Sequence, residues 1–246
     1  MKSVKFRMIA IALLSATMPF TAKAQDKVEA SVGADFVSNY IWRGTDCGGV
    51  SIQPSMGVSY KGLSLAAWGS VGIDKEDARE IDLTLGYNTG GFNVSVTDYW
   101  FSYHKEDGGY TGDYFKYGAH STIHIFEATL GYDFGPLALS WNTYFAGDDY
   151  TKENGDRAYS TYVGISAPFK LGGLDWSAEV GLTPWEGAYA NKFNVTNLTL
   201  KAEKEIKFTN SFSLPTFAQV TFNPHTQGAY FVFLSLIHIS EPTRPY

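Results

Sequence analysis

The chain alternates between apolar and polar residues with a period of two along most of its length. Within residues 50–60, one parity carries large apolar residues and proline, whereas the other carries only serine, glutamine and glycine. After Lys61-Gly62 the alternation resumes and continues to residue 72. A period of two is typical of strands with one apolar and one polar face, so this segment predicts two strands joined by a tight turn.

Segments of this kind recur along the chain and predict 12 strands. They cover residues 28–42, 50–60, 63–72, 80–88, 92–103, 123–133, 137–146, 158–167, 174–183, 194–204, 212–222 and 228–233. Short, turn-like connections alternate with longer ones at 43–49, 73–79, 104–122, 147–157, 184–193 and 223–227. An even number of strands, with short turns on one side and longer loops on the other, is typical of outer-membrane barrels. We therefore expect an all-β fold, a closed transmembrane antiparallel up-and-down β-barrel with both termini on the short-turn side.

Alternation alone does not separate this barrel from a secreted soluble barrel or sandwich whose apolar face is the core. Tyr60, Tyr87 and Tyr132 each lie just before a short turn, and Tyr40 and Trp42 lie at the other end of the first predicted strand. Aromatic residues collect in this way at membrane interfaces, and the strand lengths are close to the roughly 9–11 residues that a tilted membrane strand needs. These features favour the membrane barrel.

One residue disagrees with the face assignment. Asp98 shares its parity with Phe92, Val94 and Val96, which are assigned to the apolar outer face. A β-bulge, or a position at the outer interface, would reconcile it.

The two ends of the chain are expected to lie outside the barrel domain, which we assign to residues 25–233. Residues 1–24 combine basic residues, an apolar run and a small-residue cleavage site, the pattern of a secretory signal peptide. Residues 234–246 read like translated sequencing adapter and are treated as a foreign tail, which leaves the last strand only six residues long. We expect such a strand to close the barrel poorly.

Charge and cysteine content exclude several classes of protein. The whole chain has a formal net charge of −6, and residues 25–233 alone hold 14 basic and 24 acidic residues. This acidic balance argues against binding to nucleic acid or docking on anionic lipid. Cys47 is the single cysteine, which excludes an intramolecular disulfide. We expect export to the bacterial outer membrane, with lipid and the assembly machinery of outer-membrane barrels as partners.

The segment 38–70 carries the most specific motifs. It contains an aromatic–x–x–Arg-Gly stretch over Tyr40–Gly44, then Gln53-Pro54, and then Gly62-Leu63 followed by Trp68. In these residues the chain resembles the TorF family of porin-like bacterial outer-membrane β-barrels. The resemblance implies a barrel regarded as a channel mainly from its shape, with no established substrate.

The expected function is a porin-like passive channel for small polar solutes or cations, although the solute itself is not identified. The alternative is a non-conducting structural or surface-interaction barrel whose interior is plugged by its own side chains. Inward glycines such as Gly86, Gly131 and Gly181 would keep parts of the interior open, whereas Tyr99, Phe101, Tyr144 and Phe217 would fill it. The sequence does not decide between the two.

Charged residues of the polar parity are the candidates for lining and selectivity. They are Glu29, Asp35, Arg43, Glu80, Asp82, Glu127, Asp175 and Glu179. Rings of carboxylates favour cations in a pore. Arg43 is interpreted mainly as a structural residue that pairs with Asp35 or with an acid of another strand, and alternatively as part of a constriction.

The connection 104–122 is the segment expected to fold inward and narrow the passage, with a solvated surface loop as the alternative. Its candidate residues are Tyr110, Asp113, Tyr114, Lys116 and Tyr117.

No enzymatic activity, cofactor or metal site is expected. Ser102, His104 and Asp107 lie near the outer rim, but no motif distinguishes them from ordinary loop residues. His104, His120, His124 and His225 show no tight metal-ligand spacing, so we interpret them as exposed loop histidines.

Overall fold

The computed structural model describes residues 27–105, 109–209 and 213–239, and every regular element in these ranges is a strand. The elements are β1 (Glu29–Val37), β2 (Tyr40–Trp42), β3 (Thr45–Gly48), β4 (Ser51–Tyr60), β5 (Leu63–Gly72), β6 (Arg79–Thr89), β7 (Phe92–Ser102), β8 (Ile125–Asp133), β9 (Ala138–Gly147), β10 (Thr161–Leu171), β11 (Leu174–Thr183), β12 (Asn194–Lys207), β13 (Ser213–Asn223) and β14 (Gly228–Ile239). The described ranges contain no helix that is long and apolar enough to cross a membrane.

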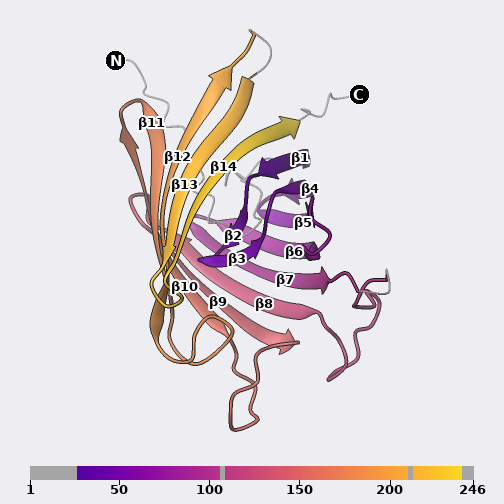
Figure 1. Ribbon diagram of the computed structural model, residues 1–246. Coiled ribbons are helices and arrows are strands. Elements are labelled where there is room, and N and C mark those ends of the chain that lie inside the picture. Colours follow the sequence, from indigo (N-terminus) through magenta and orange to yellow (C-terminus); the bar gives the residue numbers. More distant parts are fainter. Residues whose placement is uncertain (1–26, 106–108, 210–212, 240–246) are drawn as a thin grey trace.

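Twelve of these strands form one closed sheet, which confirms the predicted all-β, antiparallel up-and-down barrel (Figure 1). Each strand from β4 to β14 pairs antiparallel with its neighbour in the chain. β1 pairs with β4 on one side and with β14 on the other, and this second pairing closes the barrel. The remaining strands, β2 and β3, form a separate two-stranded sheet.

The two ends of the barrel differ as the sequence predicted. Tight turns such as Lys61–Gly62 connect strands at one end, where both residues of this turn have positive φ angles of 49° and 87°. That combination is typical of the two-residue hairpin turns that match strand twist. The longer connections, among them the β7–β8 and β9–β10 loops, extend from the opposite end (Figure 1).

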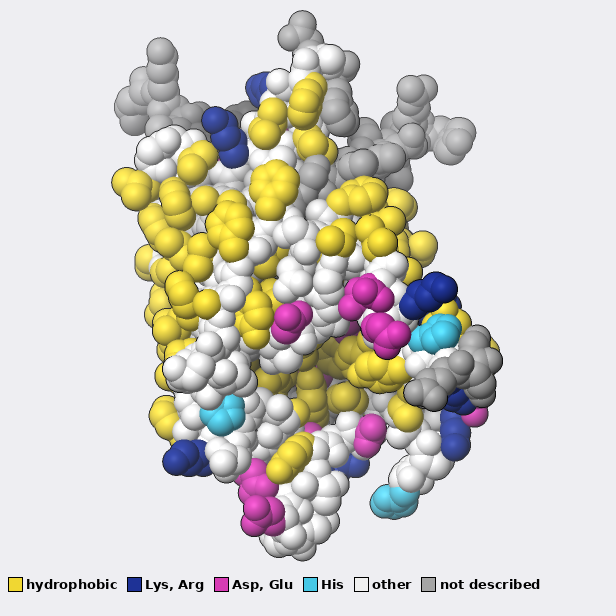
Figure 2. Space-filling view, in the orientation of Figure 1, with side chains coloured by type: hydrophobic (Ala, Val, Ile, Leu, Met, Phe, Trp, Pro, Cys, Tyr) yellow, Lys and Arg dark blue, Asp and Glu magenta, His cyan; other side chains and the backbone are white. Residues whose placement is uncertain are grey.

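The two faces of the barrel wall are inverted relative to a soluble barrel. Leucine, valine and aromatic side chains cover the outside, and Leu65 and Leu85 are each 54% exposed (Figure 2). Inward residues of the same wall are polar and buried, and Thr161, Thr183 and Thr221 have no exposed surface. The predicted outward positions of Tyr60, Tyr87 and Tyr132 are also found, with exposures of 42–45%.

Both ends of the sheet differ from the sequence prediction. The first predicted strand, 28–42, is interrupted, because β1 ends at Val37 and the chain then enters the separate β2–β3 sheet. β14 does not stop at residue 233, because residues 234–239 continue it and pair with Val37 back to Val32 of β1. The predicted signal peptide, residues 1–24, lies outside the described residues.

Candidate functional site

The β2–β3 hairpin lies inside the barrel and defines the candidate site (Figure 1). Ile41 packs against Val37, Phe217 and Val232, and the last two belong to β13 and β14. Tyr40 contacts Trp68 of β5 at a ring distance of 5.5 Å. The sequence prediction for 40–49 was therefore wrong: Tyr40 and Trp42 do not form an interfacial belt, and 43–49 is not an outer loop.

The tip of the hairpin is a two-residue turn, Arg43–Gly44, between the paired residues Trp42 and Thr45. Arg43 has φ 51° and Gly44 has φ 79°. The left-handed conformation costs an L-residue about 1–2 kcal/mol, so arginine is an unusual choice for this position. Lys61 adopts the same conformation in the β4–β5 turn, so the contacts of the Arg43 side chain, and not its φ angle alone, show what this residue does.

Gly44 is required by contact as well as by conformation. A Cβ atom at this position would lie 1.9 Å from the backbone oxygen of Thr196 in β12. The Gly44 carbonyl also accepts a hydrogen bond of 3.0 Å from the Asn223 side chain in β13. The tip of the hairpin is therefore seated against the β12–β13 wall.

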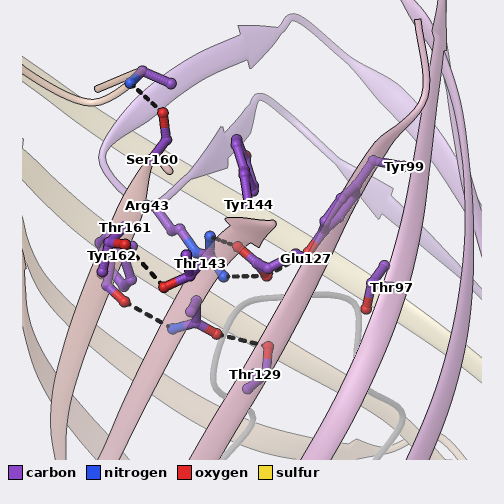
Figure 3. Close-up of polar contacts among 12 residues, drawn as sticks. Arg43, Thr97, Tyr99, Glu127, Thr129, Thr143, Tyr144, Ser160, Thr161 and Tyr162 are labelled. Atoms are coloured by element: carbon purple, nitrogen blue, oxygen red, sulfur yellow. Dashed lines mark hydrogen bonds and ion pairs between the residues drawn. The ribbon is translucent and has the colours of Figure 1, made fainter. Parts of the chain in front are cut away.

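The Arg43 side chain extends from this tip to Glu127 of β8 (Figure 3). Nη1 donates to Oε2 at 2.6 Å, and Nη2 donates to Oε1 at 2.9 Å. The two side chains are 4% and 1% exposed. This is the bidentate, fork-to-fork geometry that gives arginine–carboxylate pairs their strength and direction. Arg43 thus pairs with an acid of another strand, and Asp35 is not that partner.

Two local features of the barrel wall orient the Glu127 side chain toward the Arg43 guanidinium. The β8–β9 pairing shifts register between Phe126 and Glu127, and an irregularity of this kind re-aims a side chain. The Tyr99 hydroxyl on β7 donates to Glu127 Oε1 at 2.9 Å. The carboxylate is therefore held from two sides, by Arg43 and by Tyr99.

Aromatic rings surround the rest of the guanidinium. The Arg43 Cζ atom lies 4.3 Å from the ring centre of Trp42, 4.8 Å from that of Tyr162 and 5.8 Å from that of Tyr189. The Tyr189 hydroxyl also accepts a hydrogen bond of 2.6 Å from Nη1 and donates one of 3.2 Å to Tyr144. We call Glu127, Tyr99, Tyr144, Tyr162 and Tyr189 the guanidinium cage.

Two titratable groups at this site, Arg43 and Tyr189, lie outside the barrel strands, and their pKa values indicate that Arg43 stays charged. Burial alone would lower the pKa of Arg43, but the charge and hydrogen bonds of Glu127, together with Tyr189 and Tyr99, raise that pKa well above the ordinary value. Burial raises the pKa of Tyr189 to about 12. The cage therefore contains a permanent guanidinium and a neutral tyrosine in the connection between β11 and β12.

The remaining acids of the predicted lining are found at several levels of the interior. Glu80 and Asp82 on β6 are buried, and one carboxylate oxygen of Asp82 has no partner among the described residues. Glu179 accepts hydrogen bonds from Tyr162 at 2.5 Å and from Asn197 at 3.0 Å. Asp35 and Glu29 on β1 are partly exposed. Each of these acids has the polar parity that the sequence predicted.

Two further charged pairs change the predicted lining. Asp175 pairs with Lys170 beside the short turn between β10 and β11, where the lysine is 72% exposed. Lys201 on β12, which was not among the predicted lining residues, is buried and pairs with Glu203. Its Nζ atom lies 4.2 Å from the Phe217 ring centre. Arg43 is therefore joined by a second inward cation.

The prediction that glycines keep the interior open was wrong at the positions where neighbours fill the space. A Cβ at Gly181 would lie 2.0 Å from the Tyr162 hydroxyl, so this glycine makes room for a cage ring. At Gly131 the Asn93 side chain occupies the space, at 2.5 Å. The large inward residues Tyr99, Tyr144 and Phe217 are buried, as expected for groups that fill the interior.

The described residues of the β7–β8 connection, 104–105 and 109–122, contact the outward face of β7, so the predicted inward constriction was wrong. Its Tyr117 hydroxyl contacts Asp98 at 3.3 Å, and its Tyr114 ring contacts Trp100. Asp98 and Trp100 both have the outward parity of β7. Tyr110, Phe115 and Tyr117 are exposed, and so are Asp113 and Lys116. The inward segment is the β2–β3 hairpin.

A buried histidine explains the outward aspartate. His124 lies 2.7 Å from Asp98 through Nδ1 and 2.7 Å from the Tyr114 carbonyl through Nε2. The β6–β7 register is continuous through Asp98, so no bulge is present there. Asp98 therefore anchors the 104–122 loop, and the expectation that His124 is exposed was wrong.

We expect Gly44→Ala to displace the hairpin tip, because the new Cβ would clash with the Thr196 backbone and the left-handed conformation costs about 1 kcal/mol. The rate at which a maleimide labels Cys47, the single cysteine, should rise. Gly155→Ala is the matched control, because Gly155 has φ 86° but nothing within 4 Å of its Cβ position. Equal labelling rates in both variants would contradict this account of the tip.

No protein-family model matches the chain, and no curated protein matches it in sequence. Among solved structures, it is similar to CdiB from Acinetobacter baumannii, with 13% sequence identity and a TM-score of 0.42. The alignment covers 89% of this chain and 61% of that one, so the chain spans less than two thirds of that structure's length.

Proposed function

We propose that this protein is a bacterial outer-membrane barrel that acts as a narrow, porin-like passive channel for small polar solutes or cations. The observation that carries the proposal is the inverted wall, with an apolar exterior and a polar, acidic interior. The resemblance of residues 38–70 to TorF porins agrees with it. We propose no catalytic activity, since Ser102 donates to the Thr111 carbonyl and His104 packs on Tyr110.

The exterior supports a membrane location. Large apolar side chains on neighbouring strands are exposed at levels that a soluble protein rarely tolerates over a continuous surface. Examples are Val32 on β1, Met56 on β4 and Leu83 on β6, with exposures of 55%, 59% and 39%. A closed sheet also satisfies its backbone hydrogen bonds without water, which is the condition for crossing lipid.

The interior supports passage of cations. Asp35, Glu80, Asp82 and Glu179 face inward, and among the described residues the inward cations Arg43 and Lys201 are each paired with an acid of their own. Carboxylates that line a pore attract cations and repel anions. The hairpin lies in this interior and contacts the wall at the guanidinium cage, and we propose that it narrows the passage at that level.

A second function, a non-conducting barrel whose loops bind partners, is favoured by the packing of the cage. Arg43, Glu127, Tyr99, Tyr144 and Tyr162 are each at most 6% exposed. A layer packed to this density would stop solutes for as long as the hairpin stays in place.

Single-channel recording of the purified barrel in planar bilayers distinguishes the two functions. We expect small, discrete conductance steps from the wild-type protein. Insertion of the folded protein is judged by protease protection of its strands. If the inserted protein does not conduct in any variant, the result would favour the non-conducting barrel.

The outer face is tested separately by Leu83→Arg. An arginine that faces lipid at mid-bilayer costs roughly 2–4 kcal/mol, so we expect much less folded protein in liposomes. Thr84→Arg is the matched control, because Thr84 points inward and bonds Thr97 at 3.0 Å. Heat-modifiable migration on gels measures the folded fraction. Equal assembly of the two variants would show that the faces are assigned incorrectly.

A further inference from the structure

We propose that the guanidinium cage is a binding site for a guanidinium-type organic cation, and that the chain's own Arg43 occupies it in this structure. The proposal rests on the proposed function in one respect, since it names the chemical class of a solute for the channel. Its binding test does not require conduction.

Apart from Trp42, which belongs to the hairpin itself, the groups that contact the guanidinium belong to the barrel and the β11–β12 connection. Glu127 supplies two carboxylate oxygens, at 2.6 and 2.9 Å from the guanidinium nitrogens. Tyr162 and Tyr189 supply ring faces, at 4.8 and 5.8 Å from Cζ. A fork-shaped acceptor combined with aromatic faces is the chemistry that selects a planar guanidinium over a compact ammonium.

The cage is held in shape by contacts that do not involve the hairpin. Tyr162 bonds Glu179 and also accepts a hydrogen bond of 3.0 Å from Asn197. Tyr99 bonds Glu127 at 2.9 Å, and Tyr144 contacts Tyr189. Sites whose first contacts are supported by a second layer of this kind are preorganised for their ligand. The cage rings should therefore keep their positions when the Arg43 side chain is removed, whereas Glu127 is left without its counter-charge, which favours binding of another cation in its place.

The hairpin is less favourable as an occupant than a free solute in one respect. Arg43 reaches the cage from a left-handed turn position, with φ 51°. A separate guanidinium compound would make the contacts with Glu127, Tyr162 and Tyr189 without that backbone conformation. The acids Glu80 and Asp82, which lie buried on the inner wall of β6, would favour the approach of a cation through the interior.

The first test is binding of methylguanidinium to detergent-folded protein by titration calorimetry. We expect Arg43→Ala to bind methylguanidinium at least about tenfold more tightly than methylammonium, and Arg43→Ala with Glu127→Gln to lose that preference. Arg79→Ala is the matched control, because Arg79 also stacks on a tyrosine, with its Cζ atom 3.8 Å from the Tyr110 ring, but lies outside the cage. That variant should gain no binding.

The second test uses the wild-type protein and does not depend on a variant that folds. Cys47 lies in β3, where its side chain is partly buried while the hairpin is seated. Burial, with a smaller contribution from Glu80, also raises the pKa of its thiol, so we expect slow labelling of the seated hairpin. Methylguanidinium that displaces Arg43 should accelerate maleimide labelling of Cys47. Methylammonium at the same ionic strength should leave the rate unchanged.

Absence of methylguanidinium binding to a folded Arg43→Ala variant would overturn the proposal, and so would equal binding of the two cations. If that variant does not fold, unchanged Cys47 labelling in the wild-type protein would overturn it. Methylguanidinium binding without conductance would support the binding site and overturn the channel. Conductance without methylguanidinium binding would support the channel and overturn the binding site.

Discussion

Glu127→Gln is expected to give a large increase in conductance together with rapid labelling of Cys47. The substitution leaves the Arg43 guanidinium buried without a counter-charge. Removing one partner of a buried ion pair costs about 3–5 kcal/mol, which is comparable to the net stability of many domains. The hairpin can relieve this cost by moving Arg43 into water, whereas the barrel strands cannot move. Release of the hairpin is therefore the expected response, rather than loss of the barrel.

The matched control is Asp175→Asn, which removes the acid of the Lys170–Asp175 pair. Both partners of that pair are substantially exposed, and exposed pairs contribute about 0–1 kcal/mol. We expect unchanged conductance and labelling. If the Glu127→Gln variant has the conductance and the Cys47 labelling rate of the wild-type protein, the ion pair does not hold the hairpin in place.

The double variant Arg43→Gln with Glu127→Gln gives a sharper test. Neutral partners of similar shape can replace a buried charged pair with little loss, because no unpaired charge remains. We expect conductance closer to the wild type than in Glu127→Gln alone. Such non-additivity is the signature of two residues that interact directly.

The barrel itself was predictable because its determinants are local. A period of two, tight turns such as Lys61–Gly62 and the alternation of short and long connections depend on neighbouring residues. The two faces follow from the same period. Closure through residues 234–239 was not expected, because those residues were excluded on their resemblance to a foreign tail and not on their strand propensity.

The site was less predictable because its contacts are distant in sequence. Arg43 and Glu127 are separated by 84 positions, and no local pattern specifies which inward acid meets the arginine. A usable signal was nonetheless present, since Arg43–Gly44 repeats the basic-glycine pattern of the Lys61–Gly62 turn. Recognised as a turn, it predicts a hairpin after the first strand instead of an open loop.

The side of the barrel wall on which the β7–β8 loop packs could not be predicted from the residues of the loop alone. Its aromatic residues suit an inward constriction and an outward packing equally well. The Asp98–His124 contact decides the outcome, because it fixes the start of β8 and the Tyr114 carbonyl on the outer face. Asp98, which the alternation marks as a misfit, is one of the two residues in this contact.

The second large effect concerns ion selectivity. Reversal potentials in a salt gradient are expected to show that cations pass more easily than anions, and Glu80→Gln with Asp82→Asn should move the potential toward zero. Both acids lie on the inner wall of β6 and are at most 5% exposed, so the field of their ionised forms acts in a region of low dielectric and is poorly screened by salt. Asp74→Asn is the matched control, since Asp74 is exposed in the β5–β6 connection.

The reversal potentials of the Glu80→Gln/Asp82→Asn variant and of Asp74→Asn can both be measured in the Glu127→Gln background if the wild-type conductance is too small to resolve. The Glu80 and Asp82 carboxylates remain in place there, so cation preference should persist after the hairpin is released. Anion preference in this background would contradict the acidic interior as the source of selectivity. If Asp74→Asn shifts the reversal potential and the Glu80→Gln/Asp82→Asn variant does not, the selectivity arises in the connecting loops. Salt screens exposed charges there over about 10 Å at 0.1 M.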